Sequence, residues 1–346
     1  MARTVGIGIQ DFSDIRKNNY FYVDKTAFIK EWWESGDSVT LITRPRRFGK
    51  TLNMSMLEQF FSLRYAGKGE LFEGLSIWQE EKYRELQGTY PVISLSFANV
   101  KEEDYERTRY KICQLLENLY IKHSYLLDSD VMTQKDKDFF NRVSADMNDG
   151  DATMAIHQLS DYLTRYHGKK TIVLLDEYDT PMQEAYVRGY WEELVTFTRS
   201  MFNSTFKTNP YLERGMMTGI TRVSKESIFS DLNNLEVVTT TADKYADAFG
   251  LQVESLKPEH HNTDTYRRIL AEMKDKPCYV TNYRKGNNSG KTDEEQQAEI
   301  NSMLASVSED LEAVPDNVPL DADNDSTVTI LPFIAYGAKK IYMQPD

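Results

Sequence analysis

The chain has 346 residues, of which 40% are hydrophobic and 27% charged, and it carries a net charge of −13 at pH 7. These values are ordinary for a globular protein, and the length suggests about two domains. The acidic balance argues against binding of nucleic acid over the whole surface, because such proteins usually present a basic face.

Along most of the chain, the pattern of apolar residues predicts strands that alternate with helices. The predicted strands cover 39–43, 91–97, 171–175 and 213–220. The predicted helices cover 24–36 with Asp24 as the N-cap, 51–63, 101–125, 134–167 with a break at Gly150-Asp151, 190–207 and 259–275. Strands separated by helices predict a parallel sheet flanked by helices, which is an α/β fold.

The first strand leads into a loop that ends in Gly49-Lys50-Thr51 and is followed at once by a helix. This order is typical of a phosphate-binding loop, in which backbone N–H groups and a helix N-terminus form a cradle for anions. Lys50 would reach the β- and γ-phosphates of a nucleotide, and the Thr51 hydroxyl would hold Mg²⁺. The general pattern has glycine where this chain has Arg44.

We expect the loop and the start of its helix to contact the nucleotide. The predicted nucleotide-binding residues are Arg46, Arg47, Phe48, Gly49, Lys50, Thr51 and Leu52. For the arginines the sequence leaves three roles open: contact with the γ-phosphate, contact with a nucleic acid, or pairing with acidic residues on neighbouring loops.

A second set of chemical residues follows the strand at 171–175. Four apolar residues in a row, 172–175, are typical of a central parallel strand that is buried on both faces. Asp176 and Glu177 stand at its carboxyl end, where open α/β sheets bind ligands. Asp176 would hold Mg²⁺, and Glu177 would orient or deprotonate the attacking water. The plainer interpretation is an acidic turn at a strand end, and we expect Asp179 to cap the next helix ahead of Pro181.

Four blocks of sequence, taken in order, closely resemble the bacterial AAA-ATPase-like family of P-loop ATPases, near the STAND branch of AAA+ proteins. The blocks are Tyr-Phe-Tyr-Val-Asp-Lys-Thr (20–26), Arg-Pro-Arg-Arg-Phe-Gly-Lys-Thr-Leu (44–52), Leu-Leu-Asp-Glu-Tyr-Asp-Thr-Pro (174–181) and Thr-Gly-Ile-Thr-Arg-Val-Ser-Lys-Glu-Ser-Ile-Phe-Ser (218–230). The resemblance implies a P-loop NTPase fold and ATP and Mg²⁺ as cofactors. It assigns Lys50 and Thr51 to the P-loop (Walker A) and Asp176 and Glu177 to the Walker B motif. It makes Arg222 a sensor-type arginine, and it accounts for arginine at position 44.

The C-terminal part of the chain departs from this resemblance. The family often carries a PD-(D/E)XK nuclease-like domain there, and no such motif follows residue 256. Eleven acidic residues and no lysine or arginine lie between Asp293 and Ser326, so most of the net charge is local to this segment. We therefore expect an ATPase-like domain over 1–256 and a divergent extension of unknown role over 257–346. We expect the extension to be partly disordered, with one strand at 327–335.

The catalytic residues that we predict are Lys50, Glu177 and Arg222, and the predicted metal ligands are Thr51 and Asp176. The leading hypothesis is a Mg²⁺-dependent ATPase coupled to a conformational output. The alternative is a nucleotide-gated binding or regulatory module with little turnover, which would act with a partner that processes nucleic acid. The partner would be either another protein or a second copy of the chain. Outside the acidic segment the chain is nearly neutral, which does not favour direct contact with nucleic acid.

The remaining expectations concern location. No apolar run approaches the ~18 residues that are needed to cross a bilayer, and the N-terminus shows no apolar signal segment. The cysteines, Cys113 and Cys278, have no metal-ligand spacing. We expect a cytoplasmic protein with free thiols and no membrane contact.

Overall fold

The computed structural model describes residues 8–207, 209–220, 229, 232–239, 242 and 244–249, together with the backbone of three short strands between 278 and 344. Arg222 and the helix predicted at 259–275 lie outside the described residues, as does most of the extension predicted over 257–346. The division into two domains therefore stays a prediction.

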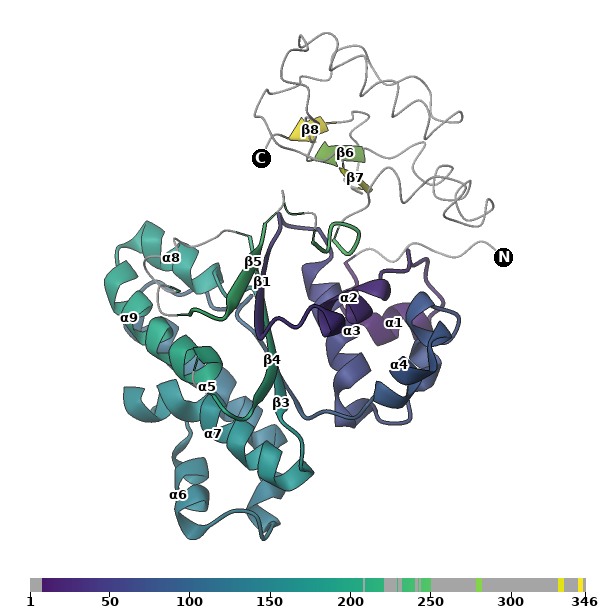
Figure 1. The fold of residues 1–346 in the computed structure, drawn as a ribbon. Helices are drawn as coiled ribbons and strands as arrows, with labels where there is room; N and C mark the ends of the chain where they lie inside the picture. The colour runs from purple at the N-terminus through teal and green to yellow at the C-terminus, as the bar shows by residue number, and fades with distance from the viewer. Residues whose placement is uncertain are drawn as a thin grey trace, which may run out of the picture.

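The centre of the fold is a five-stranded sheet in which every pair of neighbours is parallel (Figure 1). Its strands are β1 (Val39–Thr43), β2 (Val92–Ser96), β3 (Thr171–Asp176), β4 (Leu212–Gly219) and β5 (Leu235–Val238). They lie in the order β2-β3-β4-β1-β5. The α/β class and the parallel sheet are thus confirmed, and each of the four predicted strands is present within about one residue of its predicted ends.

Helices cover both faces of this sheet (Figure 1). The helices on one face are α1 (Phe12–Lys17), α2 (Ala27–Glu34), α3 (Lys50–Phe61) and α4 (Glu81–Leu86). The helices on the other face are α5 (Tyr105–Lys122), α6 (Gln134–Arg142), α7 (Asp149–His167), α8 (Thr180–Arg188) and α9 (Trp191–Phe202), and α9 continues into a π-helical turn, η5 (Asn203–Lys207). The shorter 3₁₀ turns are η1 (Leu63–Tyr65), η2 (Gly69–Leu71), η3 (Ser76–Gln79) and η4 (Ser124–Asp128). None of the described helices combines the length and apolar character that crossing a bilayer requires.

The two faces bury two separate hydrophobic clusters because side chains alternate along each strand. On β3, Ile172 and Leu174 pack with the cluster around α3, whereas Val173 and Leu175 pack with the cluster around α5 and α7. All six residues of β3 are buried. This explains why the sequence shows a continuous apolar run here rather than an alternating one.

Two local expectations were wrong. Asp24 does not cap the helix at 24–36, because Thr26 is the N-cap of α2 and the Asp24 carboxylate accepts from the backbone N–H of Thr26 and of Ser76. The break predicted at Gly150-Asp151 lies earlier, between α6 and α7, and both residues are in the first turn of α7. There Asn148 is the N-cap, and its side chain accepts from the Asp151 N–H. The predicted placement of the first helix beside β1 is confirmed by the 3.2 Å hydrogen bond from Trp32 to Thr40.

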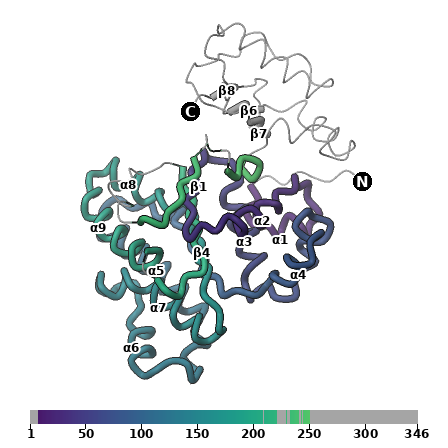
Figure 2. The backbone as a smooth tube through the Cα atoms, in the orientation of Figure 1, coloured from purple at the N-terminus to yellow at the C-terminus, as the bar shows by residue number. Residues whose placement is uncertain are grey.

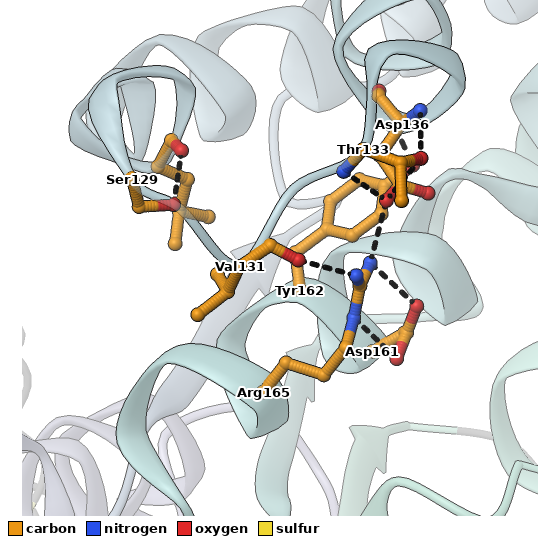
Figure 3. A network of polar contacts seen from close by, with 8 residues as sticks. Ser129, Val131, Thr133, Asp136, Asp161, Tyr162 and Arg165 are labelled. Atoms are coloured by element: carbon orange, nitrogen blue, oxygen red, sulfur yellow. Dashed lines mark hydrogen bonds and ion pairs between the residues drawn. The ribbon is translucent and has the colours of Figure 1, made fainter.

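Arg165 of α7 holds the start of α6 in place (Figure 3). Its guanidinium donates to the Val131 carbonyl, to Asp136 at 3.1 Å and to Asp161 at 3.1 Å. Asp136 also accepts from Thr133 and closes a capping box at the N-terminus of α6. Burial opposes ionisation of Asp136, but the hydrogen bonds from Thr133 and Arg165 outweigh it and lower the pKa of this carboxyl. We therefore interpret this cluster as a structural brace between two helices.

A second sheet consists of β6 (Cys278–Thr281), β7 (Thr329–Pro332) and β8 (Tyr342–Gln344). β7 runs antiparallel to β6, and β8 runs parallel to β6. β7 lies within the strand that the sequence predicts at 327–335. The thiol of Cys113 is buried and free, as expected, while the side chain of Cys278 lies outside the described residues. The course of the backbone is drawn as a tube in Figure 2.

Candidate nucleotide-binding site

The loop between β1 and α3 turns sharply at two residues with positive φ. Arg47 has φ 71° and Gly49, the N-cap of α3, has φ 77°. Glycine adopts this left-handed conformation without strain, and it leaves the N-terminus of α3 exposed at Gly49. Phe48 anchors the turn between them, because its side chain is buried in the cluster around α3. Turns of this kind direct successive N–H groups to one side, which is the geometry of an anion cradle.

Lys50 is the first residue of α3 and lies beneath this loop. It is only 5% exposed, and its ammonium donates to the carbonyl oxygens of Arg44 at 2.9 Å and Pro45 at 2.8 Å. Burial lowers the pKa of Lys50 from its ordinary value, and the nearby carboxylates of Asp176 and Glu177 act in the opposite direction. The ammonium therefore lies within the loop that it would stabilise, next to the acidic end of β3.

Three side chains form a continuous hydrogen-bonded chain across the carboxyl ends of the strands. The Thr51 hydroxyl donates to one Asp176 carboxylate oxygen at 2.7 Å, although the two residues are 125 positions apart. The Thr218 hydroxyl, near the end of β4, donates to the other oxygen. Asp176 is 4% exposed and Thr218 is fully buried. The structure thus joins the Gly-Lys-Thr loop directly to the acidic end of β3, and a residue from a third strand binds the same carboxylate.

At Glu177 the backbone turns away from the direction of β3. Its φ of 50° is in the left-handed region, which a residue with a side chain seldom adopts. Its N–H donates to the Thr218 hydroxyl at 3.3 Å, and its carboxylate accepts from the Thr180 hydroxyl at 3.2 Å. Because the chain turns here, the half-buried Glu177 carboxylate and the buried Asp176 carboxylate occupy different environments. Such strain is often found at functional sites.

The role predicted for Asp179 was wrong in one respect. Asp179 has the N-cap position of α8, ahead of Pro181, but its side chain makes no capping hydrogen bond. Its carboxylate accepts instead from the Ile220 N–H just beyond β4 and from the Gln183 side chain, both at 2.9 Å. Gly219 permits this approach, since a Cβ there would lie 2.8 Å from an Asp179 carboxylate oxygen and 2.6 Å from the Tyr178 ring.

The remaining predicted contacts surround the loop. Arg46 and Arg47 are exposed and Leu52 is half-buried, whereas the buried ring of Phe48 leaves only its backbone to face a ligand. Arg44 is 3% exposed, with its guanidinium 5.9 Å from the centre of the Phe249 ring. Arg222 lies outside the described residues. Thr218 was not among the predicted site residues, although its place near the end of the predicted strand 213–220 is a usable signal.

The oxygen donors present are suited to Mg²⁺. This cation prefers one or two carboxylates, a hydroxyl, waters and substrate phosphates over a cage built from protein alone. Thr51 and Asp176 supply a hydroxyl and a carboxylate that already contact each other. Within the described part of the chain, no group of three or more His, Cys, Asp or Glu side chains is placed to hold a metal by itself.

Comparison with known proteins agrees with the α/β fold of the chain. The model of a family described as predicted AAA-ATPase (AAA-ATPase-like) matches residues 6–229. A curated protein of Azotobacter chroococcum mcd 1, described as "Uncharacterized protein in vnfD 5'region", is 31% identical over 235 residues. That alignment covers 67% of this chain and 40% of the other protein, so the chain spans about two fifths of the length of this relative.

Proposed function

The chain belongs to the predicted AAA-ATPase family, and from this premise we propose that it binds ATP with Mg²⁺ at the loop 44–52 and hydrolyses it. Membership indicates a nucleotide-binding protein; hydrolysis and the individual roles below are our proposal. The single observation that carries it is the 2.7 Å hydrogen bond between Thr51 and Asp176. If Asp176 belonged to an ordinary acidic turn, we would not expect it to bond to the hydroxyl that follows the Gly-Lys pair.

The loop supplies binding. Its backbone N–H groups and the N-terminus of α3 face the phosphates, and the Lys50 ammonium exchanges a loop carbonyl for a phosphate oxygen. Asp176 and Thr51 would hold Mg²⁺, which when bound neutralises charge on the phosphates. Thr218 keeps the Asp176 carboxylate oriented, since its hydroxyl is bonded to the oxygen that Thr51 does not use.

Glu177 is the residue that we assign to hydrolysis. Its carboxylate is half-buried at the edge of the site and is held by the Thr180 hydroxyl. From this position it can accept a proton from a water that attacks the γ-phosphate, or orient that water. The turn at Glu177 separates this carboxylate from Asp176, so that one group serves the metal and the other serves the water.

The test is release of inorganic phosphate from ATP by the purified chain, with and without Mg²⁺. We expect Glu177→Gln to retain ATP and to lower turnover by at least about 100-fold, as removal of a general base does. The matched control is Glu192→Gln, because Glu192 is an exposed residue on α9 away from the site. Binding without turnover in the unmodified chain would leave the nucleotide-gated module as the function. Absence of ATP binding would refute both.

A further inference from the structure

The edge strand β2 borders a groove that begins at the proposed nucleotide site and continues away from it. A cavity of about 430 Å³ extends between α3 and α5 along β2. Thr51 and Asp176 lie at one end of the cavity. Arg64, Lys122 and His123 also line it. We call this cavity the β2 groove. Its volume is in the range of ordinary ligand sites.

The backbone of β2 presents unused hydrogen-bonding groups to this groove. The Pro91 carbonyl bonds to Ile172 and the Phe97 N–H bonds to the Asp176 carbonyl, so the odd-numbered residues face β3. The N–H and C=O groups of Val92, Ser94 and Ser96 therefore point away from β3 and toward the open edge. In the described part of the chain, β2 pairs along its length with β3 alone.

The same edge is already used once, at its start. The Tyr90 N–H donates to the Phe61 carbonyl at 2.8 Å, and the Leu63 N–H donates to the Tyr90 carbonyl at 2.9 Å. Ser62 thus forms a single parallel bridge with Tyr90 before the chain turns into η1. This bridge shows that the edge has strand geometry, and the row of donors and acceptors continues past it.

We propose that the β2 groove binds an extended peptide segment of a partner protein, which adds as a strand to the open edge of β2 and places an acidic side chain at the Lys122 end. Main-chain groups that recur at every second residue match an extended chain better than a compact small molecule. The docked segment would end beside Thr51 and Asp176.

The cations at the Lys122 end of the groove favour an acidic side chain there. Lys122 is exposed and has no ion-pair partner among the described residues. The Arg64 side chain is 63% exposed, and its guanidinium is 3.8 Å from Glu58, a loose contact. His123 remains neutral at pH 7, because burial lowers its pKa to about 4. The start of β2 therefore offers two weakly compensated cations, which a carboxylate of the partner would pair with.

The test uses random peptides displayed on phage and selected against the full chain without nucleotide, after which the most enriched peptide is synthesised and its affinity measured. Ser94→Pro removes one outward N–H but keeps the groups that face β3, so the sheet can persist with proline on its edge. The matched control, Ser94→Ala, keeps the N–H. We expect Ser94→Pro to weaken binding about tenfold relative to Ser94→Ala, which corresponds to one lost hydrogen bond.

A second pair of variants keeps the test decisive if Ser94→Pro fails to fold. Lys122→Glu should weaken the selected peptide about fivefold, whereas Lys135→Glu, at an exposed position on α6, should leave its affinity unchanged. The proposal is overturned if no peptide is enriched, or if both pairs of variants bind alike. It is also overturned if sedimentation shows the chain pairing with itself through this edge. Because nucleotide is absent, loss of ATP binding does not bear on the result.

Discussion

Replacing Thr218 with valine should loosen the acidic centre of the site without changing its packing. Valine has nearly the same shape as threonine, but it lacks the hydroxyl that donates to Asp176 and accepts from the Glu177 N–H. A hydrogen bond to a charged group contributes about 1.5–3 kcal/mol and a neutral one about 1 kcal/mol. Because Thr218 is fully buried, little water can take the place of the lost hydroxyl. We expect the free energy of unfolding to fall by about 2.5–4 kcal/mol.

The assay is urea unfolding followed by the fluorescence of the four tryptophans. A loss of this size lowers the midpoint by about 1 M urea when the slope stays near 3 kcal/mol per molar. Thr218→Ser, which keeps the hydroxyl and removes one methyl group, should cost about 1 kcal/mol. If Thr218→Val is as stable as Thr218→Ser, the hydroxyl does not hold Asp176 and the reasoning is refuted.

Three further predictions concern other parts of the molecule. Asp176→Ala should abolish the Mg²⁺ dependence of ATP affinity measured by titration calorimetry, and a variant that still responds to Mg²⁺ would place the metal elsewhere. The pKa of buried His123 is about 4, below its ordinary value near 6.5, so the unfolded state takes up its proton first as the pH falls. This group alone should therefore remove about 2 kcal/mol of stability between pH 7 and pH 5. His123→Gln should flatten the pH profile of urea midpoints by that amount, and an unchanged profile would contradict the assignment. Arg165→Ala should lower the free energy of unfolding by about 1–2 kcal/mol, because it breaks two contacts between α7 and the start of α6 and one contact within α7. Arg107→Ala, at a 62% exposed side chain, should cost less than about 0.5 kcal/mol, and equal losses in the two variants would argue against the brace.

Much of the fold could be predicted from local pattern. The apolar run at 172–175 and the Gly-Lys-Thr order between a strand and a helix are properties of short segments, and both were interpreted correctly as structure. The strand β5 was not predicted. It has only four residues, of which only one is buried, so its apolar pattern is too short to identify. Its membership in the sheet comes from pairing with β1, which is a tertiary contact.

The parts of the site that the sequence did not predict depend on the order of the strands. β4 lies between β1 and β3, and this order brings Thr218 against Asp176. In the same place, the Asp179 carboxylate accepts from the Ile220 N–H instead of from the backbone N–H groups at the start of its own helix. The turn at Glu177 is likewise fixed by its hydrogen bonds to Thr218 and Thr180 rather than by residue type. The roles given to Lys50, Glu177 and Arg222 remain predictions.

The central claim is that the loop around Lys50 binds the phosphates of ATP, and titration of ATP with Mg²⁺ into the unmodified chain and into Lys50→Ala tests it most directly. The matched control is Lys135→Ala, and circular dichroism of each variant shows that it is folded. We predict binding in the unmodified chain and in the control, and a loss of about 10–100-fold in Lys50→Ala, which corresponds to one charged hydrogen-bonding group. Unchanged affinity in a folded Lys50→Ala variant would contradict the account.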